Sequence, residues 1–291
     1  MQGKIIRGIG GFYYVHTHQG VYECRARGIF RKDKEKPLPG DLVSISVLDE
    51  TEKKGNLDEI LPRTNSLIRP AVANVDQALV IFALSRPTPN LPLLDRFLIM
   101  MKQKEIPTII CFNKSDMVSE EEREHFRQIY RDCGSKLLFI SAKQGEGTDA
   151  VRDCLRGHMT TVAGPSGVGK STLINHLVPE AEMETGKISE KADRGKHTTR
   201  HSELFRLEKD SYILDTPGFS SLGLFGLEKE QLAGYYPEFV PFEKYCRFGG
   251  CSHISEPVCG VKEALAEGKI SQSRYNNYVQ IYNELKDKRK Y

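Results

Sequence analysis

The sequence lacks a long apolar run: no hydrophobic stretch approaches the roughly 20 residues needed to cross a bilayer. We also expect no secretory leader, because Met1-Gln2-Gly3-Lys4-Ile5-Ile6 leads into alternating and polar sequence, not into an apolar segment. Internal repeats and low-complexity segments are absent as well. The charge surplus is only +3 over 291 residues, although both ends of the chain lean basic, as nucleic-acid contacts would require. We therefore expect a cytoplasmic globular protein, a monomer with no membrane partner.

A disulfide framework is also missing, because seven cysteines are an odd number and four of them are scattered. The other three form the pattern Cys246-x₄-Cys251-x-His253-x₅-Cys259. Three thiols and an imidazole within 14 residues match the four tetrahedral ligands that Zn²⁺ prefers, and they leave no open position for catalysis. We expect one structural zinc ion per chain, the alternative being four unrelated side chains.

Residues 1–69 contain short β-branched and aromatic segments separated by turns, a pattern typical of a small β-barrel. The oligonucleotide-binding (OB) fold is the expected type, although an SH3-like barrel would have a similar sequence. Tyr13, Tyr14 and Tyr22 either fill this barrel or stack on RNA bases, whereas His16 and His18 are expected to face solvent. The predicted strands are Lys4–Ile9, Phe12–Thr17, Val21–Phe30, Leu42–Leu48 and Asn56–Leu61.

Residues 70–224 alternate between apolar strands and helices, which predicts a mostly parallel sheet covered by helices on both faces. From residue 225 to residue 291 the pattern is mostly helical and includes the cysteine cluster. A helix over Ser271–Lys290 carries a stripe of Tyr275, Tyr278, Val279 and Tyr282, which we expect to pack on the zinc-binding segment. The sequence thus predicts a barrel, a central α/β domain and a helical zinc-binding domain.

A phosphate-binding loop lies between the predicted strand Thr160–Ala163 and a predicted helix, with the pattern G-x-x-x-x-G-K-[ST]. Glycines let backbone N–H groups turn inward around phosphate oxygens, and the helix N-terminus adds positive potential. Lys170 would reach the β- and γ-phosphates, and Ser171 would ligate Mg²⁺. The loop and the start of its helix read Gly164-Pro165-Ser166-Gly167-Val168-Gly169-Lys170-Ser171-Thr172.

A guanine-reading motif, Asn113-Lys114-Ser115-Asp116, follows the predicted strand Pro107–Phe112. The Asp116 carboxylate can accept both N–H donors on one edge of guanine, a pair that adenine lacks. Lys114 can lay its aliphatic stem on the base, and Asn113 can tie the motif to the phosphate loop. Ser141-Ala142-Lys143 ends the next strand, where a backbone N–H would meet the guanine carbonyl oxygen.

The switch motifs come last in the chain. Asp215-Thr216-Pro217-Gly218 follows an apolar strand, so Asp215 would hold the Mg²⁺ shell and the Gly218 amide would sense the γ-phosphate. Thr199 is the expected second hydroxyl near Mg²⁺, with Thr198 as the alternative. Phe219 stands where many GTPases place a water-orienting glutamine, so we expect His197 to position the water, with a loop cap or an RNA contact as its alternative roles.

These five motifs are those of GTPases, but they occur in the order four, five, one, two, three. The permuted order, the N-terminal barrel and the C-terminal Cys/His set resemble the ribosome small subunit-dependent GTPase A family over essentially the whole chain. The resemblance implies a GTP hydrolase with Mg²⁺ and zinc. It also implies stimulation by the small (30S) ribosomal subunit, binding to 16S rRNA through the barrel and zinc domain, and action in late subunit maturation.

Three other functions compete with this interpretation. A permuted GTPase could serve another RNA or the large subunit, but the barrel and the Cys₃His set favour the small subunit. A nucleic-acid-binding module with a merely structural nucleotide site is disfavoured by Lys170, Ser171 and Asp215. A P-loop ATPase is disfavoured by Asp116, which selects guanine.

Overall fold

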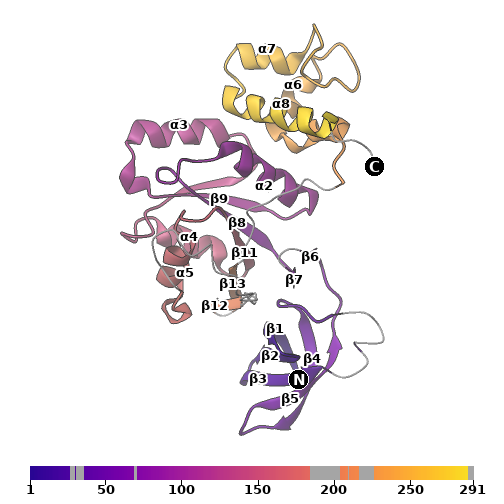
Figure 1. Ribbon diagram of the computed structural model, residues 1–291, viewed down its shortest axis with the longest axis vertical. Helices are drawn as coiled ribbons and strands as arrows, with labels where there is room; N and C mark the ends of the chain where they lie inside the picture. Colours follow the sequence, from indigo (N-terminus) through magenta and orange to yellow (C-terminus); the bar gives the residue numbers. More distant parts are fainter. Residues whose placement is uncertain are drawn as a thin grey trace. The chain divides into compact units, whose positions relative to one another are not determined.

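The computed structural model describes residues 1–26, 30, 36–68, 71–183, 204–208, 210–215 and 226–287 (Figure 1). The chain forms two compact units, which are described in turn. The first comprises Met1–Leu79, Thr148–Ser166 and Lys170–Ser220, and the second comprises Val80–Gly147, Gly167–Gly169 and Ser221–Tyr291.

The first unit begins with a closed five-stranded barrel in the order β1-β2-β3-β5-β4, with β1 antiparallel to β4 and β3 parallel to β5. This Greek-key arrangement is the OB type, which decides between the two barrels that the sequence allowed. Its strands are β1 (Gln2–Ile9), β2 (Phe12–Thr17), β3 (Gly20–Ala26), β4 (Leu42–Asp49) and β5 (Lys54–Ile60). Tyr22 is fully buried among the aliphatic side chains of the barrel core, so it packs and is not free to stack on a base.

The two histidines of the barrel differ. His18 is exposed, as expected, but the prediction that His16 faces solvent is wrong. His16 is half-buried and contacts Tyr212, 196 positions later in the sequence, with 2.8 Å between Nδ1 and the tyrosine hydroxyl. Strand alternation distinguished the inward from the outward face of the barrel, but it carried no information about what covers the outward face.

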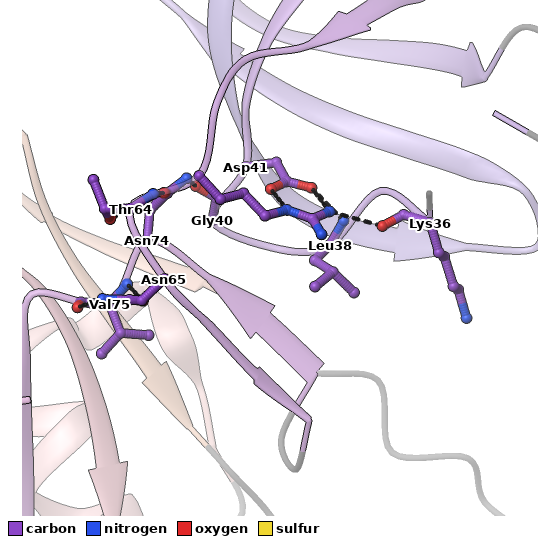
Figure 2. A network of polar contacts seen from close by, with 9 residues as sticks. Lys36, Leu38, Gly40, Asp41, Thr64, Asn65, Asn74 and Val75 are labelled. Atoms are coloured by element: carbon purple, nitrogen blue, oxygen red, sulfur yellow. Dashed lines mark hydrogen bonds and ion pairs between the residues drawn. The ribbon is translucent and has the colours of Figure 1, made fainter. Parts of the chain in front are cut away.

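The chain leaves the barrel through a pair of short antiparallel strands, β6 (Ser66–Ile68) and β7 (Ala71–Ala73). Polar contacts fix this connection (Figure 2). Arg63 donates from Nε and Nη2 to the two carboxylate oxygens of the fully buried Asp41, at 2.7 and 2.8 Å. Asn65 and the backbone of Val75 exchange two hydrogen bonds of 2.8 and 2.9 Å. The connection is therefore tied both to the barrel and to itself.

The rest of the first unit contains the start of β8, Gln77–Leu79, and three further strands of a six-stranded sheet, in the order β8-β11-β13-β12. β11 and β13 are parallel, and β12 adds an antiparallel edge, so the sheet is mostly parallel as predicted. Every residue of β8 and of β11 is buried, as expected for central strands. The elements are β8 (Gln77–Ala83), α4 (Thr148–Leu155), β11 (Met159–Ala163), α5 (Lys170–Leu177), η2 (Pro179–Ala181), β12 (Leu204–Glu208) and β13 (Ser211–Asp215).

The second unit contains the end of β8, Val80–Ala83, and the remaining two strands, in the order β10-β9-β8, with β9 and β10 parallel. Its α3 helix begins with a capping box, because Ser119 and Glu122 each accept a hydrogen bond from the other's backbone N–H. Cys111 is fully buried and acts as a small hydrophobic residue. The elements are α2 (Leu91–Gln103), β9 (Thr108–Asn113), η1 (Ser115–Met117), α3 (Glu120–Tyr130) and β10 (Lys136–Phe139).

The helical C-terminal part packs on α2 and α3 within the second unit (Figure 1). The predicted stripe on its last helix is confirmed: Tyr278 is buried in the core, and Tyr275, Val279 and Tyr282 pack against that core. The elements are η3 (Lys229–Tyr235), η4 (Pro237–Phe239), α6 (Val240–Glu243), α7 (Gly260–Ala266) and α8 (Gln272–Asp287). Among the described residues, no helix has the length and apolar character that a membrane crossing requires.

Candidate nucleotide-binding and metal sites

Asn113 is the centre of the predicted base-reading motif. It ends β9, and its side chain is almost fully buried. Its Nδ2 donates to the carbonyl oxygen of Val168 in the phosphate loop at 2.8 Å. Its Oδ1 accepts from the backbone N–H groups of Lys114 at 2.8 Å and Ala142 at 2.9 Å. One amide side chain thus connects three separate predicted motifs, as the sequence led us to expect for the phosphate loop.

Lys114 adopts a left-handed backbone conformation (φ 62°), which turns the chain sharply after the strand. Its Nζ donates to the carbonyl oxygen of Gly167 at 2.8 Å and to that of Arg86. Burial lowers the pKa of the Lys114 ammonium, and the nearby Asp116 carboxylate opposes that shift. The lysine is therefore held by two carbonyl groups, while Asp116 is exposed and accessible to a ligand.

The Ser141-Ala142 motif follows β10 and lies against the base-reading motif. Ser141 is fully buried, and its N–H donates to the carbonyl oxygen of Glu146 at 3.0 Å. The Ala142 amide, which the sequence offers to a guanine carbonyl oxygen, already donates to Asn113. A guanine would therefore have to share that donor.

The phosphate loop connects β11 to α5, as predicted. Its glycines Gly164, Gly167 and Gly169 have φ values of 148°, 77° and 98°, which other residues rarely adopt. A Cβ on Gly169 would lie 2.3 Å from Nδ2 of Asn113, so the glycine also permits the contact between loop and base-reading motif. Lys170 Nζ donates to the carbonyl oxygens of Gly164 and Pro165, at 2.9 and 2.7 Å.

The remaining predicted magnesium and switch residues are only partly described. Ser171 and Thr172 lie half-buried in the first turn of α5. Asp215 is the last residue of β13, at the carboxyl end where ligands bind in such sheets. His197, Thr199 and Gly218 lie outside the described residues.

The predicted metal ligands come together in the second unit. One ligand atom from each of Cys246, Cys251, His253 and Cys259 lies within 4.8 Å of all the others. His253 Nδ1 is 3.6 Å from the sulfur of Cys246 and 3.4 Å from that of Cys259, and the two sulfurs are 3.8 Å apart. This cluster could hold a metal ion.

The backbone that carries these ligands is fixed from outside. Tyr275 and Tyr278 of α8 donate their hydroxyl protons to the carbonyl oxygens of His253 and Ser252, both at 2.7 Å. Glu256 accepts from the Ser252 N–H at 2.8 Å and the Ile254 N–H at 3.2 Å. Burial alone would raise the pKa of the Glu256 carboxyl, but these hydrogen bonds lower it to about 2. The ligand loop is thus held in place by the tyrosine stripe and by an ionised carboxylate.

The second unit also contains a buried ionic network that the sequence patterns did not predict. Arg274 of α8 is 1% exposed and pairs with Asp95 of α2 and with Glu238 of η4, the latter at 2.7 Å. Asn277 and Tyr130 also donate to Asp95, at 2.7 and 3.1 Å. A signal was available, because Arg274 precedes Tyr278, Ile281 and Leu285 at helical spacing on the buried face of α8.

Two family models match the chain. The model described as RsgA GTPase matches residues 60–225, and the model described as RsgA N-terminal domain matches residues 2–55. A protein of Agathobacter rectalis named small ribosomal subunit biogenesis GTPase RsgA is 56% identical, over 100% of both chains. A protein of the same name from Alkaliphilus metalliredigens is 50% identical, over 100% of this chain and 99% of its own.

Two solved structures are similar over almost their entire length. YjeQ from Thermotoga maritima has a TM-score of 0.81 and 32% identity, and the match covers 99% of each chain. YloQ, described as a circularly permuted GTPase, has a TM-score of 0.78 and 37% identity, over 100% of this chain and 96% of its own. The permuted motif order thus has a counterpart in a protein of known structure.

Proposed function

Because the chain belongs to the RsgA GTPase family, we propose that it hydrolyses GTP in the late maturation of the small (30S) ribosomal subunit. The names of its relatives support the biogenesis role. By this proposal the subunit stimulates hydrolysis, and the protein leaves after turnover. The partners are GTP or GDP and the 16S rRNA, and the protein acts as a cytoplasmic monomer.

The preference for guanine rests on the position of Asn113, which fixes the motif that carries Asp116 beside the phosphate loop. Asn113 bonds to the phosphate loop and to the Ala142 amide, while Asp116, three residues on, presents an exposed carboxylate. A base read by Asp116 would be guanine, because only guanine offers two N–H donors on one edge. We assign guanine recognition to Asn113, Lys114, Asp116, Ser141 and Ala142.

We assign the phosphates to residues 164–172, with Lys170 on the β- and γ-phosphates. Lys170 now donates to two loop carbonyls, which a γ-phosphate oxygen would replace as stronger, charged acceptors. Mg²⁺ would be held by Ser171, Thr199 and Asp215, and it would neutralise charge that develops on the phosphate oxygens. The Gly218 amide would contact the γ-phosphate.

The attacking water needs a positioning group, and Phe219 cannot supply one. We propose that His197 accepts a hydrogen bond from that water, with Thr199 and Lys170 completing the catalytic set. This assignment rests on the sequence. A His197→Ala variant should keep its nucleotide affinity and lose stimulated turnover; retained stimulated turnover would remove His197 from the mechanism.

We propose that the Cys/His cluster binds one structural Zn²⁺. Tetrahedral zinc, with bonds of about 2.3 Å to sulfur and about 2.0–2.1 Å to nitrogen, places two sulfurs about 3.8 Å apart and sulfur and nitrogen about 3.6 Å apart. The separations of 3.8, 3.6 and 3.4 Å between Cys246, His253 and Cys259 fit these values. Burial lowers the pKa of His253, with Glu243 opposing, and a neutral imidazole is the form that binds metal.

We propose three functional segments: the OB barrel at residues 1–69, the permuted GTPase domain at 70–224 and the zinc-binding helical domain at 225–291. Barrel and zinc-binding domain would contact rRNA. Exposed aromatic rings under cations support this role, as with Lys244 above Tyr245 at 5.0 Å and Arg247 above Phe248 at 5.7 Å. Such paired surfaces can stack on bases and neutralise phosphates.

The deciding experiment measures GTP turnover by the purified protein alone, with small subunits and with large subunits, and uses ATP as the control nucleotide. We expect slow intrinsic turnover and strong stimulation by the small subunit only. Asp116→Asn is the matched variant and should weaken GTP binding selectively. Turnover without stimulation would retain the GTPase and reject the ribosomal role, and no GTP turnover at all would reject both.

A further inference from the structure

The barrel contacts the GTPase strands at the ends opposite to their nucleotide-binding motifs. β11 and β13 are parallel neighbours, with Met159 opposite Tyr212 and Val162 opposite Asp215. The barrel contacts the first pair, Met159 and Tyr212. Three residues further, or about 10 Å along a strand, β11 leads into the phosphate loop and β13 ends at Asp215. The contact therefore lies on the two strands that carry the phosphate-binding and magnesium motifs.

His16 makes the first of these contacts, and its neighbours fix its protonation. Arg206 of β12 lies 3.1 Å from His16 Nε2, and because arginine only donates, Nε2 must be the unprotonated acceptor. The ring proton of neutral His16 therefore sits on Nδ1, where it donates to the Tyr212 oxygen at 2.8 Å. A protonated ring would set an N–H against the Arg206 guanidinium. The contact thus requires neutral histidine.

Lys4 makes the second contact. Its ammonium lies 4.6 Å from the centre of the Tyr212 ring, and His16 meets the same ring edge-on. Tyr212 is 4% exposed, so barrel and sheet bury this ring between them. Because β13 is hydrogen-bonded to β11 on one side and to β12 on the other, a displacement of Tyr212 moves a strand embedded in a sheet. Close-packed interiors have low compressibility and transmit strain.

Gly40 makes the third contact, on the neighbouring strand. A Cβ at Gly40 would lie 2.1 Å from the carbonyl oxygen of Ala73 and 2.5 Å from Cε of Met159. The Gly40 carbonyl oxygen accepts from Nδ2 of Asn74 at 3.0 Å, within the network that fixes the barrel connection (Figure 2). Barrel and β11 therefore meet without space for adjustment, whereas the His16 contact depends on a few hydrogen bonds.

We propose that His16 is a positioning residue through which engagement of the barrel by RNA reaches the nucleotide site along β13 and β11. This coupling role rests on the proposed function, because it requires a partner that binds the barrel and stimulates hydrolysis. The coupling acts on the stimulated rate: RNA binding shifts the barrel, His16 and Lys4 carry the shift to Tyr212, and β13 changes the position of Asp215.

The test compares His16→Ala with His18→Ala, an exposed histidine of the same barrel. Nucleotide affinity, unstimulated turnover and affinity for the small subunit should stay within about twofold of wild type in both variants. The stimulated kcat of His16→Ala should fall about fivefold or more, within the range of typical coupling energies. His16→Gln, which keeps one donor and one acceptor, should restore part of the rate.

Tyr212→Phe supplies a second variant, because it removes only the hydroxyl that His16 contacts. Its stimulated kcat should fall as in His16→Ala, and the double variant should lose no more than either single variant, since both remove one interaction. An unchanged stimulated kcat in either single variant overturns the proposal, as does a loss confined to subunit affinity. If wild type itself shows no stimulation by the small subunit, the proposed function fails and this proposal fails with it.

Discussion

The two appended parts of this protein are attached to its GTPase elements by different chemistry. The barrel is held in the first unit by a half-buried histidine, a cation over a ring and a close glycine contact. The helical metal-binding part is held in the second unit by Arg274 and Asp95, which are 1% and 0% exposed. Half-buried hydrogen bonds can break and re-form at small cost because water replaces a lost partner. Buried charges cannot do so, since each would be left unpaired.

The comparison indicates that half-buried hydrogen bonds suit a contact that must change when a partner binds. Buried ion pairs suit a contact that must stay fixed. A partner that displaces the barrel only needs to exchange the contacts of His16 and Lys4 for others. By contrast, Arg274 binds Asp95 and Glu238 together, and its guanidinium lies 4.6 Å from the centre of the Tyr236 ring. Although burial lowers its pKa, the two carboxylates raise the pKa of Arg274 well above the usual value. The metal-binding part and helices α2 and α3 should therefore move as one body.

Removing the metal should have the largest effect. Chelation, or Cys251→Ser, should unfold the segment from Val240 to Asp287, because structural zinc contributes on the order of 10 kcal/mol in small domains. Hydrogen exchange should show lost protection in α7 and α8 and unchanged protection in β1–β5. Metal analysis should find one zinc per chain. A metal-free protein with full protection in α8 would contradict both the zinc assignment and its structural role.

Removing the buried side chain of Arg274 should have the second largest effect. Arg274→Ala leaves Asp95 and Glu238 buried without their partner and should destabilise the second unit by about 3–5 kcal/mol. The matched control is Arg131→Ala, whose pair with Asp132 is more than half exposed and should matter by at most about 1 kcal/mol. The free energies come from exchange of the most protected amides in α2 and α8. Equal losses of unfolding free energy in the two variants would mean that the Arg274 network does not attach the helical part to α2.

A side chain at Gly40 should weaken the attachment of the barrel, because Gly40 lies close to Ala73 and Met159. Gly40→Ala and Gly11→Ala share a positive φ, 90° and 87°, so both should cost about 1–2 kcal/mol from backbone strain. Only Gly40→Ala also drives a Cβ against Ala73 and Met159, whereas nothing lies within 4 Å of the corresponding position at Gly11. The difference should be about 1–3 kcal/mol of overpacking. Urea unfolding of the two variants measures it, and equal midpoints would show that the barrel shifts without strain.

The contacts that attach the barrel and the helical part could not be predicted from the sequence. Local motifs were predictable because their chemistry and spacing are contained in a few residues, as with Asn113 to Asp116 or Cys246 to Cys259. The metal ligands come together as their spacing predicted. Arg274 was not recognised, because its partner Asp95 lies 179 positions away and a charged residue on a polar helix is usually solvated.

Two features of the β-sheets were also not predictable from the sequence. The β6–β7 pair was missed because strands of three residues are too short to show alternation. For residues 70–224 the sequence predicted a mostly parallel sheet, and the antiparallel direction of β12 at its edge follows from its pairing with β13, which its composition does not reveal. Directions and partners of strands depend on contacts that are formed only when the chain folds.

The smallest expected effect is the response of the barrel contact to pH. Burial, Arg206 and Lys4 lower the pKa of His16 below its ordinary value of 6.5, and Asp210 opposes them. The folded protein therefore favours neutral His16. Its contacts with Tyr212 and Arg206 are fully present above about pH 6.5, and they weaken as the pH falls from there through the lower folded-state pKa. An NMR titration of the His16 ring should show a midpoint below 6.5 that rises in Arg206→Ala. A midpoint at or above 6.5 in wild type would contradict both the burial of the ring and its contact with Arg206.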